Sequence, residues 1–179
     1  MVQVVGFNGL DLDALRRIVD EISRNPSMVK QTSTWVARTR WLGGFRVKAY
    51  VRNFTVEFDE PDSLGGSGKA PKPTEYILAA LGACLTIGFI LNATKRGVRV
   101  NDLEIALEGD LNNVLVFLGL SNEGHPGYRE IRVKAYINTD APENIVKELW
   151  EYTVKTSPVG NTLTNTVNLI TDVKVINEV

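Results

Sequence analysis

The chain contains very few of the residues that build metal sites and disulfide bonds. Its 179 residues include a single cysteine, Cys84, and a single histidine, His125. Zinc sites need several Cys and His ligands, so this composition excludes a zinc or iron–sulfur site. One cysteine also leaves no partner for a disulfide within the chain. We therefore expect a protein that holds no metal and no other cofactor.

The chain also lacks an excess of charge of either sign. Its 20 basic and 21 acidic residues leave a net charge of −1 at pH 7. Such a balance produces no field that attracts phosphate backbones or anionic membrane surfaces. We expect neither nucleic acid nor a membrane among its partners.

A secretory signal and a membrane-spanning run are missing as well. The opening MVQVVGFNGLDLDALRR turns acidic by Asp11, where a secretory signal would have its apolar region. The longest apolar run, from Tyr76 to Asn92, falls short of the roughly 20 residues that a bilayer span needs. We expect a cytoplasmic protein in which this run is a buried core helix.

The overall composition is that of an ordinary globular domain. Apolar residues make up 44% of the chain and charged residues 23%, and a typical domain has roughly 100 to 200 residues. No internal repeat or linker divides the sequence. We expect residues 1–179 to form one domain, with residues 1–28 as an N-terminal helical extension.

The extension carries one amphipathic helix. Apolar side chains recur at helical spacing between Leu10 and Ser23, ahead of the terminator Asn25-Pro26. Asn8 or Asp11 is available as the N-cap. The apolar face of this helix predicts packing or a dimer contact, because nothing on the helix forms a chemical constellation.

Alternating apolar and polar residues predict an antiparallel sheet in the first third of the chain. The alternation begins at Thr34, turns at Gly43-Gly44, continues to Val51 and restarts as the strand Phe54–Phe58. A loop rich in glycine and proline follows between residues 62 and 73.

Beyond this loop, helical and strand patterns form separate runs. Pro73 can open a long helix that Gly97 closes. The later elements are a strand from Val98 that ends near Glu108-Gly109-Asp110, a strand at Ile131–Ile137, a helix from Asp140-Ala141-Pro142-Glu143 to Val154 ended by Ser157-Pro158, and a final strand at Val167–Val175. This segregation favours an α+β fold with a mostly antiparallel sheet.

Cys84 is the candidate nucleophile, and its position makes two interpretations available. A free cysteine on an apolar helix is most often inert core filler. A reactive thiolate needs a nearby cation or a helix N-terminus, and Cys84 lies about ten residues into its helix, beyond the reach of the helix dipole. Any activating charge must therefore belong to a side chain.

Arg52 is the leading candidate for that cation, with Lys69 and Lys72 as alternatives. Glu75 can orient such a cation, although helical geometry places Glu75 and Cys84 on opposite faces. If both serve one site, Glu75 works from an irregular first turn or across a subunit interface. A pairing of Cys84 with His125 is less favoured, because the turn-rich context NEGHPG predicts a histidine that faces solvent.

Residues 70–84, APKPTEYILAALGAC, closely resemble the signature of the OsmC/Ohr family, together with the preceding Asp59-Glu60-Pro61 and Leu64-Gly65-Gly66. The resemblance covers most of the chain from about Thr34 onward and leaves out the N-terminal helix. Further matches follow in order at Glu108-Gly109-Asp110, Ala141-Pro142-Glu143, Ser157-Pro158-Val159 and Thr162-Leu163-Thr164-Asn165.

The resemblance implies an OsmC-like fold, in which antiparallel sheets wrap long central helices in an intertwined homodimer. Active members of the family reduce organic hydroperoxides with a peroxidatic cysteine assisted by an arginine and a glutamate. A second cysteine then resolves the sulfenic acid as a disulfide. By this resemblance Cys84 matches the peroxidatic cysteine, and Arg52 and Glu75 match the assisting pair.

The chain departs from this pattern at the resolving position. Ser157-Pro158 stands where the peroxidase branches carry Cys-Pro, and a serine hydroxyl cannot form a disulfide. Turnover would therefore need an external thiol to reduce oxidised Cys84.

Two functions remain open on the sequence. The first is a one-cysteine peroxidase of oxidative stress defence, with an apolar pocket lined by Tyr76, Leu85 or Phe89. The alternative is a non-catalytic dimeric protein that binds a hydrophobic or thiol-reactive small molecule.

Overall fold

The computed structural model of the protein describes residues 6–176, apart from the side chains of residues 30–32. Its helices are α1 (Leu12–Arg24), α2 (Ser27–Thr32), α3 (Pro73–Lys95), α4 (Val114–Phe117), α5 (Glu143–Thr156) and α6 (Pro158–Thr164), with a 3₁₀ turn at Asp62–Leu64. Its strands are β1 (Arg38–Gly43), β2 (Arg46–Val51), β3 (Phe54–Phe58), β4 (Val100–Leu111) and β5 (Tyr128–Thr139). The expected α+β class is confirmed.

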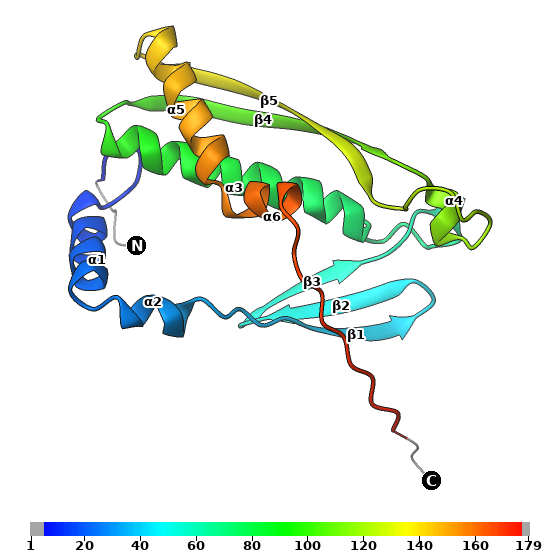
Figure 1. Ribbon diagram of the computed structural model, residues 1–179. Helices are drawn as coiled ribbons and strands as arrows, with labels where there is room; N and C mark the ends of the chain where they lie inside the picture. The colour runs from blue at the N-terminus through cyan, green and yellow to red at the C-terminus, as the bar shows by residue number, and fades with distance from the viewer. Residues whose placement is uncertain (1–5, 177–179) are drawn as a thin grey trace.

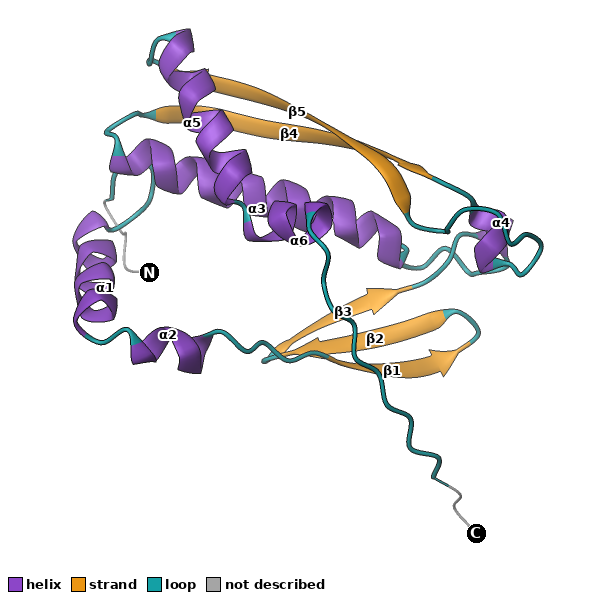
Figure 2. Cartoon of the chain, in the orientation of Figure 1, coloured by secondary structure: helices purple, strands orange, loops and turns teal. Residues whose placement is uncertain are grey.

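The strands form two separate antiparallel sheets, one on each side of the long helix α3 (Figure 1). The first sheet has the order β1-β2-β3, and its β1–β2 hairpin turns at the predicted glycine pair, Gly43 and Gly44, both at positive φ. The second is the ribbon β4–β5, paired from Val100 opposite Thr139 to Leu111 opposite Tyr128. Figure 2 shows helix α3 lying between the two sheets, with α5 and α6 beside it.

The core lies where α3, α5 and the start of β4 meet. Phe89, Ala93 and Leu149 are wholly buried there, and the ring of Trp150 packs against that of Phe89 at a centroid distance of 6.4 Å. Two interior glycines of α3 permit this close packing. A Cβ atom on Gly82 would lie 2.7 Å from Leu107, and one on Gly88 would lie 3.2 Å from Thr153.

Helix α3 begins and ends where the sequence predicted. Pro73 is its first residue, the Glu75 carboxylate accepts a hydrogen bond from the Lys72 N–H at 2.9 Å, and Gly97 follows the last turn at φ 71°. This arrangement satisfies backbone groups at the start of the helix and provides the left-handed residue that commonly ends one.

One expectation about α3 needs correction. The helix has 23 residues because it extends beyond the apolar run Tyr76 to Asn92 at both ends, and by length and composition alone it could cross a membrane. It is less buried than expected, because only about a third of its most apolar window is covered by the rest of the chain. One face packs on β4 and α5, and the other is open.

The loop before α3 is organised by a buried carboxylate. Asp59 is 1% exposed and accepts hydrogen bonds from the hydroxyl and N–H of Ser67 and from the N–H groups of Glu60 and Lys69. These donors hold the pKa of Asp59 below its ordinary value, with the Ser67 hydroxyl as the largest cause. The glycine-rich loop is therefore folded around one side chain, which fixes where α3 starts.

The N-terminal extension is attached to the far end of α3. Asp11 caps α1, as one of the two predicted alternatives, by accepting from the Ala14 N–H at 2.9 Å. Asn8 instead donates to the Thr94 hydroxyl and the Val98 carbonyl and accepts from the Val100 N–H. The apolar face of α1 is exposed within the chain, and residues 1–5 of the extension lie outside the described residues.

Several local predictions were wrong. The short helices α2, α4 and α6 were not predicted, and α5 begins after Pro142 with no side-chain cap, whereas the predicted helix began at Asp140. The expected final strand at Val167–Val175 is absent, since this segment is irregular and Leu169 is 84% exposed. An alternating pattern produces a strand only where a neighbouring strand supplies hydrogen-bond partners, and the described chain pairs none with this segment.

Candidate active site around Cys84

Cys84 lies in the middle of α3, on the border of its open face. The side chain is partly exposed and is the one free thiol of the chain. It lines an open groove of about 610 Å³ together with Ala80, Ala83, Ile87 and Leu91 from α3, and with Tyr152, Thr156 and Pro158 from α5 and the start of α6. The thiol is therefore partly accessible within the chain, and the interpretation of Cys84 as inert core filler stays a prediction.

The structure brings Ser157 against Cys84. The Ser157 hydroxyl donates a hydrogen bond to the Cys84 sulfur, with an Oγ–Sγ distance of 3.3 Å. Ser157 is only 3% exposed, so water competes little for this contact. The two positions that the family resemblance paired as peroxidatic and resolving residues are thus neighbours, although they lie 73 residues apart in the sequence.

The packing of α5 on α3 explains why Ser157 arrives there. The Asn92 side chain donates to the Thr153 hydroxyl at 3.1 Å, beside Gly88, which leaves room for Thr153. The two helices run past each other in opposite senses (Figure 1). One turn onward on α5 from Thr153 is Ser157, and one turn back on α3 from Gly88 is Cys84.

Arg52 and Glu75 lie elsewhere within the single chain. Arg52 occupies the β2–β3 turn at φ 55°, is exposed, and places its guanidinium 5.3 Å from the centre of the Phe54 ring. Glu75 is exposed at the first turn of α3 and caps the helix. No hydrogen bond or ion pair joins either residue to Cys84 in the described chain, so their assignment to one site remains a prediction.

The other predicted partners of Cys84 are also placed away from it. Lys69 is exposed in the loop that surrounds Asp59, and His125 is exposed in its own turn, where its Nδ1 accepts from the Gly127 N–H at 3.2 Å. Lys95 is the one cation among the residues that line the groove. It lies eleven residues along α3 from Cys84, a rise of about 16 Å, too far to contact the sulfur.

The pocket predicted from Tyr76, Leu85 and Phe89 is not the groove around Cys84. Tyr76 stacks on Phe58 and donates to the Glu57 carbonyl, and Phe89 is in the core. Leu85 lines a second, mainly apolar cavity of about 620 Å³ between α3, β5, α5 and α6. The groove residues could have been found from helical spacing, because Ala80, Ile87 and Leu91 recur on the face of Cys84.

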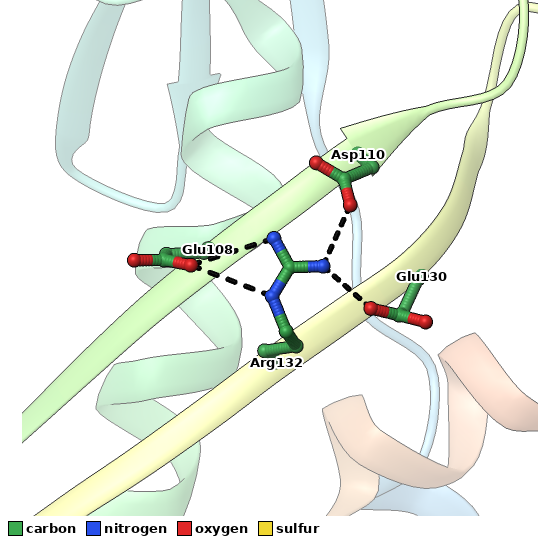
Figure 3. Close-up of polar contacts among 4 residues, drawn as sticks. All are labelled: Glu108, Asp110, Glu130 and Arg132. Atoms are coloured by element: carbon green, nitrogen blue, oxygen red, sulfur yellow. Dashed lines mark hydrogen bonds and ion pairs between the residues drawn. The ribbon is translucent and has the colours of Figure 1, made fainter.

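The Glu108-Gly109-Asp110 landmark has a separate structural role. Figure 3 shows Arg132 of β5 surrounded by Glu108, Asp110 and Glu130, with its guanidinium 2.6 Å from an Asp110 oxygen and 3.4 Å from Glu108. This pairing raises the pKa of Arg132 and lowers that of Asp110. Gly109 points the other way, where a Cβ atom would meet the Tyr128 ring. That ring carries the hydroxyl that donates to the Thr74 carbonyl at the start of α3.

The Cys84–Ser157 pair limits the chemistry of this site. The sulfur can act as a nucleophile or reducing centre, and the hydroxyl beside it can donate a hydrogen bond but cannot form a disulfide. Among the described residues, no three His, Cys, Asp or Glu side chains group as metal ligands. The supported chemistry is that of one accessible thiol.

Comparisons with known proteins show which family and fold the chain is similar to. The family model described as OsmC-like protein matches residues 66–172, well over half of the chain. No curated protein sequence matches the chain. The OsmC-like protein of Mycoplasma pneumoniae superposes with a TM-score of 0.63 at 23% identity, over 73% of this chain and 86% of that one.

Two further solved structures carry the name organic hydroperoxide resistance protein. The Legionella pneumophila protein has a TM-score of 0.57 at 19% identity, over 73% of this chain and 89% of its own. The Elizabethkingia anophelis protein has a TM-score of 0.54 at 14% identity, over 74% of this chain and 91% of its own. At these identities the likenesses establish the fold.

Proposed function

Because the chain belongs to the OsmC-like family, we propose that it is a thiol-dependent peroxidase that reduces organic hydroperoxides through Cys84. The observation that carries this proposal is a partly exposed sulfur that lies 3.3 Å from the Ser157 hydroxyl, in an open groove. Structural neighbours named as organic hydroperoxide resistance proteins support the substrate class. The reaction would serve oxidative stress defence in the cytoplasm, where small thiols are kept reduced.

The proposed cycle uses one cysteine and an external thiol. The Cys84 thiolate attacks the distal peroxide oxygen, the O–O bond breaks, and the alkoxide takes a proton and leaves as an alcohol. Cys84 is then a sulfenic acid. One external thiol attacks its sulfur, releasing water and forming a mixed disulfide, and a second external thiol releases Cys84 with formation of the external disulfide.

We propose that the protein works as a homodimer, in which the partner covers the apolar surfaces left open here. Ile87 on α3, Val19 on α1 and Leu169 in the C-terminal segment are all more than half exposed within the chain. A monomer rarely exposes so much apolar surface without a binding role. In this arrangement Arg52 and Glu75 reach Cys84 across the subunit interface, Arg52 to stabilise the thiolate and polarise the peroxide, and Glu75 to position Arg52.

The peroxidase proposal is tested by hydroperoxide consumption. Wild-type protein and Cys84→Ser are given an alkyl hydroperoxide with dithiothreitol or a lipoyl dithiol. We expect Cys84→Ser to fall to the uncatalysed rate. Ala83→Ser is a matched control, because it adds the same hydroxyl one residue earlier and keeps the sulfur. Equal rates for the wild type and Cys84→Ser would end the proposal.

Mixing subunits tests whether Arg52 acts on the partner. Cys84→Ser subunits have an intact Arg52, and Arg52→Ala subunits have an intact Cys84. If Arg52 serves the partner's cysteine, a heterodimer of the two has one complete site and recovers activity that neither parent shows. A mixture that stays inactive, although heterodimers form, would mean that Arg52 serves the cysteine of its own chain.

The second candidate function is binding without catalysis. The cavity of about 620 Å³ lined by Leu81, Leu85, Trp150 and Leu163 is large enough for a small hydrophobic molecule. Native mass spectrometry of the purified protein tests this candidate. A bound lipid-like mass in Cys84→Ser as well as the wild type, with no peroxide consumption by either, would favour binding.

A further inference from the structure

The Ser157 hydroxyl is the polar group closest to the proposed reacting atom. It is almost fully buried at the junction of two helices, ending α5 and capping α6. The Gly160 N–H donates to its oxygen at 3.0 Å, and the Cys84 sulfur lies 3.3 Å on its other side. Both contacts therefore define how the hydroxyl is oriented.

The Ser157 hydroxyl is the donor in its contact with Cys84. A serine hydroxyl has one proton and two lone pairs, and the Gly160 N–H occupies one lone pair while leaving the proton free. A thiolate has no proton of its own, so ionised Cys84 can only accept from this hydroxyl. Gly160 makes this arrangement tight, since a Cβ atom there would lie only 3.1 Å from the Ser157 oxygen.

We infer that Ser157 is a functional residue of the Cys84 site, whose hydroxyl stabilises negative charge on the sulfur and holds it in one orientation. The inference deepens the proposed function and rests on it only for the peroxide reaction, because the hydrogen bond would act on any reaction of the thiolate. A donor to an anion is among the stronger hydrogen bonds in proteins. Ser157 would thus stabilise the Cys84 thiolate, and the external thiol would reduce the Cys84 sulfenic acid.

Alkylation of Cys84 by iodoacetamide tests the inference without needing peroxidase activity. We expect Ser157→Ala to slow alkylation by about tenfold near neutral pH, the size of effect that loss of one hydrogen bond to a charged group produces. The rates of variant and wild type should converge at high pH, where the thiolate forms without help. Ser157→Thr keeps the hydroxyl and should stay within about threefold of the wild type.

A capping control separates the hydroxyl–sulfur contact from the stability of α6. Glycine is a better N-cap than alanine, so Ser157→Gly removes the hydroxyl with less disturbance of the helix start. Equal slowing in Ser157→Gly and Ser157→Ala supports the inference. Near wild-type alkylation in Ser157→Gly, or a rate change of the same size at every pH, would overturn it.

The hydroperoxide assay on the same variants distinguishes the two proposals. If alkylation slows as expected but wild-type protein consumes no hydroperoxide, the proposed function fails and the role of Ser157 stands. The opposite outcome is a wild type that consumes hydroperoxide, together with Ser157 variants whose Cys84 is alkylated as fast as that of the wild type. In that case the role of Ser157 fails and the proposed function stands.

Discussion

The two faces of α3 carry similar side chains in very different surroundings. On one face Phe89 is wholly buried against Leu149 and Trp150, whereas two residues earlier Ile87 is 68% exposed. A helix that is apolar all round is usually enclosed on all sides. The chain encloses only one side of α3, and Cys84 lies at the border between the two. In the proposed homodimer, the partner would therefore cover the open face beside Cys84.

The same contrast separates the two sheets. The ribbon β4–β5 packs on α3 along with α5. Among the described residues, the buried apolar side chains gather there, except for Ala49 in β2. The sheet β1–β3 contacts the start of α3 through Tyr76, and its Trp41 and Phe54 side chains are exposed. We therefore expect the packed half, formed by α3, α5 and the ribbon β4–β5, to supply most of the folding stability. We expect the open half, formed by the sheet β1–β3 and the exposed face of α3, to supply the proposed dimer contacts.

The largest expected effect comes from breaking the packed face. Phe89→Ala removes a fully buried ring and should lower the free energy of unfolding by about 3 to 5 kcal/mol. Chemical denaturation measures the loss. Leu120→Ala is the control, because Leu120 is 73% exposed and should change stability by about 0.5 kcal/mol or less. Similar losses of unfolding free energy in both variants would contradict the difference between the buried and exposed faces.

The next effect comes from the open face. Ile87→Glu places a charge where the proposed partner packs, and burying an unpaired charge is costly. We expect the homodimer to weaken by about 100-fold or more, measured as mass by light scattering across a concentration series. Ile87→Val should remain dimeric. A wild type that is monomeric at all concentrations, or an Ile87→Glu dimer as tight as the wild type, would contradict the proposed assembly.

A smaller effect is expected at the junction between the two halves. The lowered pKa of Asp59 means that its contribution to stability is present above its unfolded pKa, near 3.9, and is lost as the pH falls through the folded value. Asp59→Asn should lower the melting temperature by roughly 5 °C at neutral pH. The difference from the wild type should shrink toward pH 3, and a constant difference would contradict this account. Asp102→Asn controls for removal of a surface charge.

The smallest effect is expected on the outside of the packed half. Arg132 is 46% exposed, so its ion pairs with Glu108 and Asp110 are screened by solvent. Arg132→Ala should shift the melting temperature by roughly 2 °C, with a smaller shift in high salt. Thermal unfolding at two salt concentrations measures this. A large, salt-independent loss would show that the pairing supports the ribbon more than its exposure suggests.

Sequence patterns correctly predicted those parts of the fold that depend on the backbone preferences of neighbouring residues. The Gly43-Gly44 hairpin and both ends of α3 follow from backbone preferences of glycine and proline. The prediction of a final strand at Val167–Val175 was wrong because a strand needs a neighbouring strand for its hydrogen bonds, and the sequence pattern does not specify one. Helix α6 was missed because its seven residues, PVGNTLT, have low helix propensity and depend on the Ser157 cap.

The candidate site divides in the same way. Cys84 was singled out as the one cysteine of the chain and Ser157 by the family resemblance, and their contact results from how α5 crosses α3. The proposed roles of Arg52 and Glu75 would depend on a second chain, and a pattern within one sequence does not specify where that chain lies.

The attachment of Asn8 to the end of α3 bears on the order of folding. Its hydrogen bonds to Thr94, Val98 and Val100 span 86 to 92 residues. Closing a loop of that length in an unfolded chain costs about 4 kcal/mol, more than three ordinary hydrogen bonds return. On these magnitudes we expect the attachment to close after the intervening sheet and helix have shortened the loop.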